Sequence, residues 1–147
     1  MRGLFGKWFT IVHCFDPADK RNMSLLYEEL SYRIRGMFFK IYNELGPGFK
    51  ENVYVEALLK LLGDDNIPYK REKQFSINFN DTKVGATKID LVIDNKIIIE
   101  VKATEINNSL FEKQILSYLK STGIKLGFLV NFGTNKLYIR RYINSKR

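Results

Sequence analysis

The spacing of the apolar residues changes partway along the chain, and this change constrains the fold more than any other feature. From Met23 to Leu45, apolar side chains recur every three or four residues, which predicts an amphipathic helix that ends at Gly46-Pro47-Gly48. From Phe75 onward, apolar and polar residues alternate, as they do in a β-strand with one buried face. The sequence therefore predicts an α/β domain.

Turn residues divide the rest of the chain into short segments. A second helix is expected over residues 51–62, and a third over residues 109–121, where Ser109 and Glu112 form a capping box and Gly123 follows the last turn. The predicted strands span residues 75–79, 84–93, 97–102, 125–131 and 136–143. The predicted order is α-α-β-β-β-α-β-β, a mixed β-sheet core flanked by helices.

Length and composition favour one globular domain. The chain has 147 residues, 45% of them hydrophobic, which suffices for one core. Residues 1–22 fit this domain poorly and are expected to be a loosely attached extension to a single domain over residues 23–147. A single cysteine and the lone His13 exclude an internal disulfide and a structural zinc site. The start of the chain only faintly resembles a signal peptide, and no apolar run is long enough to span a membrane, so we expect a cytoplasmic protein.

The net charge of +8 is unevenly distributed. Residues 74–147 carry 12 basic and 6 acidic side chains, whereas residues 1–73 carry 12 and 10. A basic half indicates a polyanionic partner, with nucleic acid first and an anionic membrane second. Charge alone is equally compatible with a basic surface that binds nothing.

Two carboxylates interrupt the apolar strands. Alternation places Ile89, Leu91 and Ile93 on one face and Asp90 on the other. If residues 94–96 form the turn, Asp90 lies opposite Glu100, with Lys102 one pleat further on the same face. Two opposed carboxylates are destabilising unless a cation lies between them. A solvent-facing charged stripe is the alternative, but the isoleucines at 97–99 argue for a buried cluster kept for chemistry or metal binding.

Two helices add polar residues to this candidate site. Glu51 lies on the apolar side of the second helix, although a carboxylate in the first turn of a helix is also stabilised by the helix dipole. Gln114 and Tyr118 lie one turn apart on the third helix, where they form either an amphipathic boundary or part of the site.

These residues together resemble a known family. Asp90 followed by Glu100-Val101-Lys102 resembles the D…ExK core of the PD-(D/E)XK nuclease superfamily, with Ile89 at the position of the proline. Gln114-x-x-x-Tyr118 resembles the QxxxY element of the RecB-like branch. The segment from Gly48 to Tyr54 reads as GxxExxY, and with Asn131-Phe132-Gly133 it resembles the GxxExxY family of that superfamily over residues 23–143.

The resemblance implies a restriction-endonuclease-like fold and metal-dependent hydrolysis of phosphodiester bonds, with DNA as the preferred substrate. The implied ligands of Mg²⁺, for which Mn²⁺ substitutes, are Asp90, Glu100, the Val101 carbonyl and Glu51. Lys102 is implied to orient or deprotonate the attacking water or to neutralise the phosphate, and Gln114 and Tyr118 to hold the nucleic acid strand. A homodimer is possible for so small a chain.

Two other interpretations stay open. The same fold serves as a non-catalytic module that binds nucleic acid or protein, since fold alone does not fix function. Alternatively, Lys102 bridges Asp90 and Glu100 in a purely structural cluster.

Overall fold

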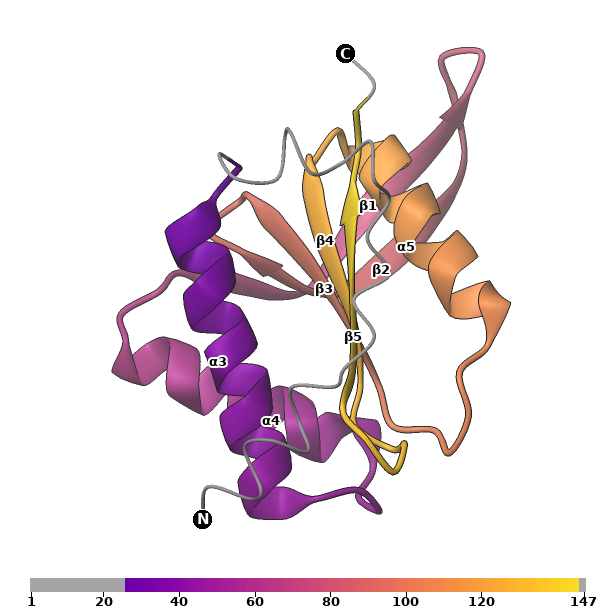
Figure 1. Cartoon of the computed structure of the whole chain (residues 1–147). Coiled ribbons are helices and arrows are strands. Elements are labelled where there is room, and N and C mark those ends of the chain that lie inside the picture. Colours follow the sequence, from indigo (N-terminus) through magenta and orange to yellow (C-terminus); the bar gives the residue numbers. More distant parts are fainter. Residues whose placement is uncertain (1–25, 146–147) are drawn as a thin grey trace.

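Helices cover both faces of a five-stranded sheet (Figure 1). The computed structural model describes residues 26–145. Its elements in chain order are α3 (Glu28–Leu45), α4 (Glu51–Asp64), β1 (Tyr69–Phe79), β2 (Thr82–Ile93), β3 (Ile97–Lys102), α5 (Ser109–Thr122), β4 (Leu126–Asn131) and β5 (Tyr138–Ile143). This order confirms the prediction made from the apolar pattern.

The sheet is mixed, as predicted. Its strand order is β1-β2-β3-β4-β5, and only β3 and β4 run parallel. Parallel neighbours need a crossover connection, and α5 provides it. Ile93 pairs with Ile97 across the turn at residues 94–96, so the predicted register of β2 on β3 is confirmed.

Each face of the sheet has its own apolar cluster. The cluster under α3 and α4 includes Ile34, Phe38, Leu58, Leu91, Ile99 and Phe128. The smaller cluster under α5 contains Ile89, Val92, Ile98, Ile115, Leu119, Leu129 and Tyr142. Both faces of β3 and β4 are therefore buried, which explains why their sequences are almost continuously apolar.

Two helix starts differ from the prediction. The helix expected from Met23 begins at Glu28, after Tyr27 in a left-handed conformation that cannot continue a helix; residues 23–25 lie outside the described range. Ser109 is not the cap of α5, because the side chain of Asn108 accepts the hydrogen bond from the Leu110 amide. Asn is as good an N-cap as Ser, and sequence alone does not separate the two neighbours.

The first strand is longer than predicted. It begins at Tyr69, six residues before the first alternating apolar residue, Phe75. Residues 69–74 carry no apolar signal because β1 is an edge strand exposed along most of its length. Its polar half is held instead by pairing with β2 and by Arg71, whose guanidinium contacts Glu56 and Asn52 of α4.

The predicted face of Ile89 is wrong. Leu91 pairs with Arg71 and packs under α3 and α4, yet Ile89, two residues earlier, packs under α5. The alternation breaks at the position between them, where Asp90 lies beside Glu72, whose φ of 50° is left-handed. A left-handed residue in one strand of a pair locally disrupts the ladder and turns the chain, as in a β-bulge.

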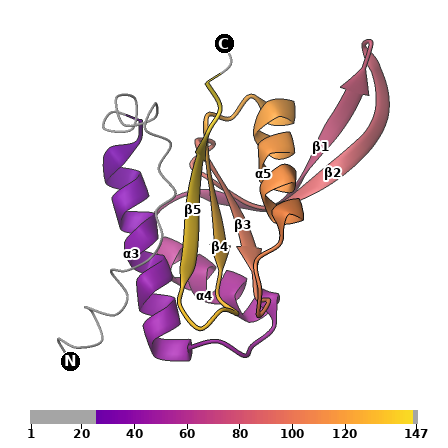
Figure 2. The ribbon, with the colours of Figure 1, turned by 45° about the vertical axis from the view of Figure 1, so that its right-hand side comes forward.

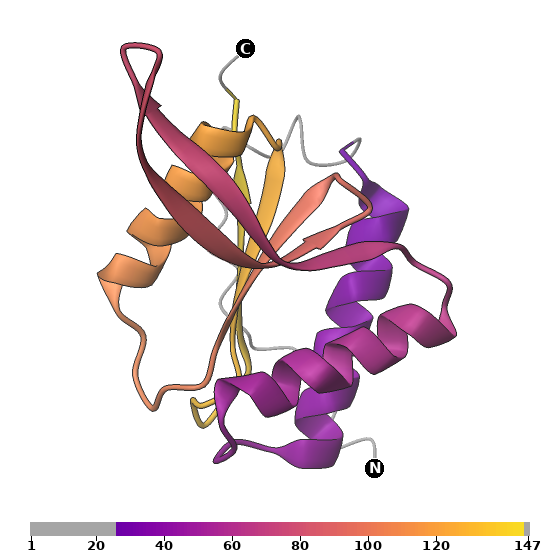
Figure 3. The ribbon, with the colours of Figure 1, turned by 180° about the vertical axis from the view of Figure 1, so that it is seen from behind.

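Beyond this break, β1 and β2 continue as a hairpin whose tip stands clear of the sheet (Figure 2). Seen from behind, the hairpin crosses the face of the molecule that carries α5 (Figure 3). Phe79 and Val84, on either side of the turn, are 68% and 60% exposed.

The predicted extension, residues 1–22, lies outside the described residues. Within residues 26–145, no helix is both long and apolar enough to cross a membrane.

The turn that follows β4 packs directly on the segment that follows β3. The amide of Asn131, which is fully buried, accepts hydrogen bonds from the backbone N–H groups of Thr104 and Gly133 and donates to the side chains of Thr104 and Asn107. A Cβ atom on Gly133 would lie 2.4 Å from the Thr104 nitrogen, which leaves space only for glycine.

We therefore expect Gly133→Ala to destabilise the domain by about 1–3 kcal/mol, the usual cost of overpacking. Gly36→Ala is the matched control, since Gly36 lies exposed in α3 with nothing within 4 Å of its Cβ position. That control should gain about 0.5–1 kcal/mol from helix propensity. Urea unfolding measures both, and an equally stable Gly133→Ala protein would contradict the close approach.

Candidate active site

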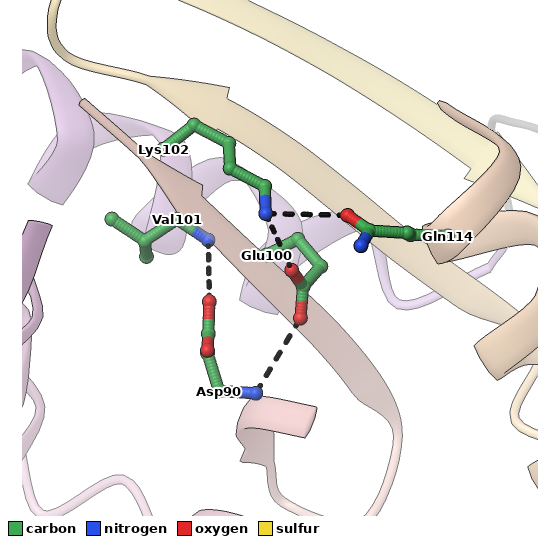
Figure 4. Close-up of polar contacts among 5 residues, drawn as sticks. All are labelled: Asp90, Glu100, Val101, Lys102 and Gln114. Atoms are coloured by element: carbon green, nitrogen blue, oxygen red, sulfur yellow. Dashed lines mark hydrogen bonds and ion pairs between the residues drawn. The ribbon is translucent and has the colours of Figure 1, made fainter. Parts of the chain in front are cut away.

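The two predicted carboxylates meet where the ladder between β2 and β3 stops. The last backbone pair is Leu91 with Ile99, and the next position is occupied by Asp90 and Glu100. An Asp90 carboxylate oxygen accepts a hydrogen bond from the Val101 N–H at 3.1 Å, and Glu100 Oε1 lies 3.5 Å from the Asp90 nitrogen (Figure 4). Side-chain oxygens thus replace backbone carbonyls at this position, and Glu100 is only 3% exposed.

Lys102 lies next to this pair, at the end of β3. Its Nζ atom is 3.6 Å from Glu100 Oε2 and donates a hydrogen bond to Gln114 Oε1 at 3.2 Å (Figure 4). The ammonium also lies 4.8 Å from the centre of the Phe111 ring. Three contacts from two elements fix this charge beside the carboxylates, and the sequence does not identify Phe111 as a site residue.

Glu51 approaches the site from the first turn of α4, and the loop before α4 is held in place by Tyr54. The Tyr54 hydroxyl donates to the Gly46 carbonyl at 2.7 Å and accepts from the Phe49 amide at 3.2 Å. Gly48 has a φ of 113°, which favours glycine. The Tyr54 ring stacks on Phe132, with ring centres 4.5 Å apart. The Gly, Glu and Tyr of GxxExxY therefore act together to position one carboxylate.

Gln114 and Tyr118 both face the site from α5. Gln114 contacts Lys102, and Tyr118 lies beside the Thr87 side chain on β2. Thr87 was missed by the sequence, because it is an ordinary strand residue until the hairpin is placed beside α5. The structure thus brings Asp90, Glu100, Lys102, Gln114 and Tyr118 together, with Glu51 near enough to influence Asp90 electrostatically.

A protein-family model matches most of the chain. Residues 28–142 match the family model described as PD-(D/E)XK nuclease superfamily. The chain belongs to the PD-(D/E)XK nuclease superfamily. Members of the superfamily are generally hydrolytic nucleases that use divalent metal ions. A search of curated proteins found no match to the sequence.

A solved structure supports the fold. The crystal structure of SSO0001 is similar to this chain with a TM-score of 0.51 and 20% sequence identity. The similarity covers 65% of this chain and 50% of the other, so the matched region corresponds to half of that protein. At this identity the comparison concerns the fold alone, which is restriction-endonuclease-like as the sequence predicted.

Burial is the main cause of the raised pKa values of the three carboxylates in this nuclease-superfamily site. Burial, with Asp90 next in importance, raises the pKa of Glu100 from its ordinary 4.5 to about 8, although Lys102 opposes the shift. Burial also raises the pKa of Asp90, against the hydrogen bond from Val101 and the charge of Lys102. The pKa of Glu51 is raised by burial and then by Asp90. One lysine does not neutralise three carboxylates.

The donor chemistry fits a divalent metal ion of the kind the superfamily uses. Asp90 and Glu100 offer hard carboxylate oxygens at one point, as Mg²⁺ and Mn²⁺ prefer. A cation there would also offset the repulsion from Asp90 that, after burial, raises the pKa of Glu100. Within residues 26–145, however, no three His, Cys, Asp or Glu side chains are grouped closely enough to hold a metal ion. Glu51 is therefore not part of a preformed three-carboxylate cluster.

The raised pKa of Glu100 predicts how stability depends on pH in EDTA. The folded state keeps a proton that the unfolded state loses above pH 4.5, so stability falls as pH rises toward about 8 and then levels off. Glu100→Gln should flatten this slope and be about 1–3 kcal/mol more stable than wild type at pH 8.

Thermal unfolding at a series of pH values measures this effect. Glu105→Gln is the control, since Glu105 is an exposed glutamate in the loop after β3 and should leave the slope unchanged. A wild-type stability that rises between pH 5 and 8 would contradict the assignment.

Proposed function

We propose that this protein is a metal-dependent nuclease that hydrolyses phosphodiester bonds of DNA. The observation that carries the proposal is the meeting of Asp90 and Glu100 at the end of the β2–β3 ladder, with Lys102 fixed beside them. A buried cluster with more carboxylates than cations is costly to fold, and such clusters occur mainly where a metal ion or a reaction uses them.

Each residue has a distinct role in this proposal. Asp90 and Glu100, together with the Val101 carbonyl, hold Mg²⁺, and Glu51 completes the coordination from α4; Mn²⁺ substitutes. The metal ion, when bound, lowers the pKa of a water molecule and stabilises charge on the phosphate. Lys102 orients the attacking water or neutralises the phosphate, a role that its contacts with Glu100 and Gln114 support.

The substrate is proposed to be DNA held by its backbone. Gln114 and Tyr118 contact the strand from α5, on the same side of the sheet as Lys102. The basic excess of residues 74–147, which include both the carboxylates and α5, favours binding of a polyanion and makes it dependent on salt.

Family placement, location, domain bounds and assembly also belong to this proposal. The organisation of the segment from Gly48 to Tyr54 supports placement in the GxxExxY family, and Gln114 with Tyr118 supports the RecB-like branch. We propose a cytoplasmic protein whose residues 1–22 are an extension of the domain at 23–147. We also propose a homodimer, and light scattering after size exclusion tests this assembly.

The decisive variant is Asp90→Asn, which keeps the shape of the side chain and removes its charge. We expect cleavage of plasmid and of linear DNA in Mg²⁺ to fall by roughly 100-fold or more, since even loss of a group that only orients a metal ligand costs about 10–100-fold. Asp94→Asn is the matched control, because Asp94 pairs with Lys96 at the surface turn four residues away. Equal cleavage by Asp90→Asn and wild type would overturn the proposal.

Metal binding separates this function from the non-catalytic alternative. The absence of a preformed three-carboxylate group among residues 26–145 is the observation that favours a binding module. Millimolar Mg²⁺ or Mn²⁺ should raise the Tm of wild type by mass action and leave that of Asp90→Asn nearly unchanged. DNA binding with neither a Tm shift nor cleavage would favour the binding module.

A further inference from the structure

A pocket lies between α5 and the β1–β2 hairpin, next to the candidate active site. Its volume is about 330 Å³, at the small end of the range for ligand pockets. Ile77 and Thr87 form its wall on the hairpin. The wall on α5 consists of Leu110, Lys113, Gln114, Ser117, Tyr118 and Ser121.

The pocket is adjacent to the proposed catalytic residues. Gln114 lines it and also accepts the hydrogen bond from Lys102 Nζ, so only one side chain separates the pocket from the lysine. Tyr118 lines it too, opposite Thr87 on the hairpin. A strand with a phosphate at Asp90 and Glu100 therefore has a neighbouring nucleotide beside this pocket.

The lining suits a nucleobase. Ile77 and Leu110 give the pocket apolar walls that are 39% and 53% exposed, and Tyr118 adds an aromatic ring. No acidic residue lines the pocket. Lys113 is exposed, and no ion pair within residues 26–145 engages it. Apolar and aromatic walls with a cation at the rim are what a base and its phosphate require.

We infer that this pocket is a nucleobase subsite that holds one unpaired base of the substrate next to the scissile phosphate. This inference rests on the proposed nuclease function. A volume of about 330 Å³ suits one base better than a base pair with its stacked neighbours. Few fixed polar groups line it, because the Ser117 hydroxyl donates to the Lys113 carbonyl and the Ser121 hydroxyl donates to the Ser117 carbonyl. The subsite therefore accepts bases with little sequence preference, and the substrate is single-stranded or frayed at the cutting position.

The test measures how the affinity for an oligomer with bases and for one without bases changes when the pocket is altered. Fluorescence anisotropy in EDTA measures the affinity of the full chain for labelled oligothymidylate and for an abasic oligomer of the same length and charge. Wild type should prefer the oligothymidylate about tenfold, the effect of one stacked base. Ser117→Phe fills the pocket and should bring this ratio close to one, with little change in binding of the abasic oligomer.

Leu116→Phe is the matched control. It places the same ring on the neighbouring residue of α5, which is 44% exposed and does not line the pocket, so the ratio should stay near ten. Ile77→Ala, at an exposed hairpin position, is a second variant that lowers the ratio without filling the pocket. A wild-type ratio near one overturns the subsite, and so does a ratio that Ser117→Phe and Ile77→Ala leave unchanged.

The readout separates the subsite from the proposed function, because it needs neither metal nor turnover. A ratio that depends on the pocket, without cleavage in Mg²⁺ or Mn²⁺, supports the subsite and contradicts hydrolysis. Cleavage that Asp90→Asn abolishes, with a wild-type ratio near one, supports hydrolysis and contradicts the subsite.

Discussion

The contact between Asp90 and Glu100 is the constraint on which the rest of the site depends. Strands β2 and β3 pair through their backbones as far as Leu91 and Ile99, and the two carboxylates take over at the next position. In a continued ladder, the backbone N–H groups at this position would bond to carbonyl oxygens. Here the Val101 N–H bonds to an Asp90 carboxylate oxygen instead, so the strands separate without leaving this N–H unpaired. The position of both carboxylates is thus determined by the backbone, while their charges are only partly compensated by Lys102.

The surrounding loops hold this arrangement from two directions. Tyr54 anchors the loop before Glu51 and stacks on Phe132, which follows β4. The Phe132 amide donates to the Lys102 carbonyl at 2.8 Å, so the end of β3 and the loop before α4 are joined through one aromatic residue. Asn131, the residue before Phe132, adds four hydrogen bonds to the loop after β3 and to Gly133. Motif residues that look dispersed in the sequence therefore form one continuous support under Lys102 and Glu51.

The sequence predicts the structural features that depend on the local spacing of apolar residues and on short turns. The element order, the three-residue turn at 94–96 and the opposition of Asp90 and Glu100 all follow from spacing, because pairing across a short turn leaves only one register. It does not predict the polar half of β1, whose residues are held by pairing with β2 rather than by their own burial. Nor does it predict the face of Ile89, because the left-handed conformation of Glu72 arises in the partner strand. Non-local pairing decides both cases, and a single sequence carries no direct signal of it.

The break at Glu72 and Asp90 links the catalytic residues to the pocket beside them. If alternation continued unbroken from Leu91, then Thr87 and Ile89 would face α3 and α4, and the hairpin would turn Ile77 away from α5. The break turns this set of residues to the α5 face, where Ile89 joins the smaller core and Thr87 meets Tyr118. It also coincides with the position where Asp90 leaves the ladder and contacts the Val101 amide. One local departure from strand geometry therefore releases Asp90 from the β2–β3 ladder and also forms the hairpin wall of the adjacent pocket. A substitution at Glu72 that removed this break would change both the carboxylate position and the pocket wall.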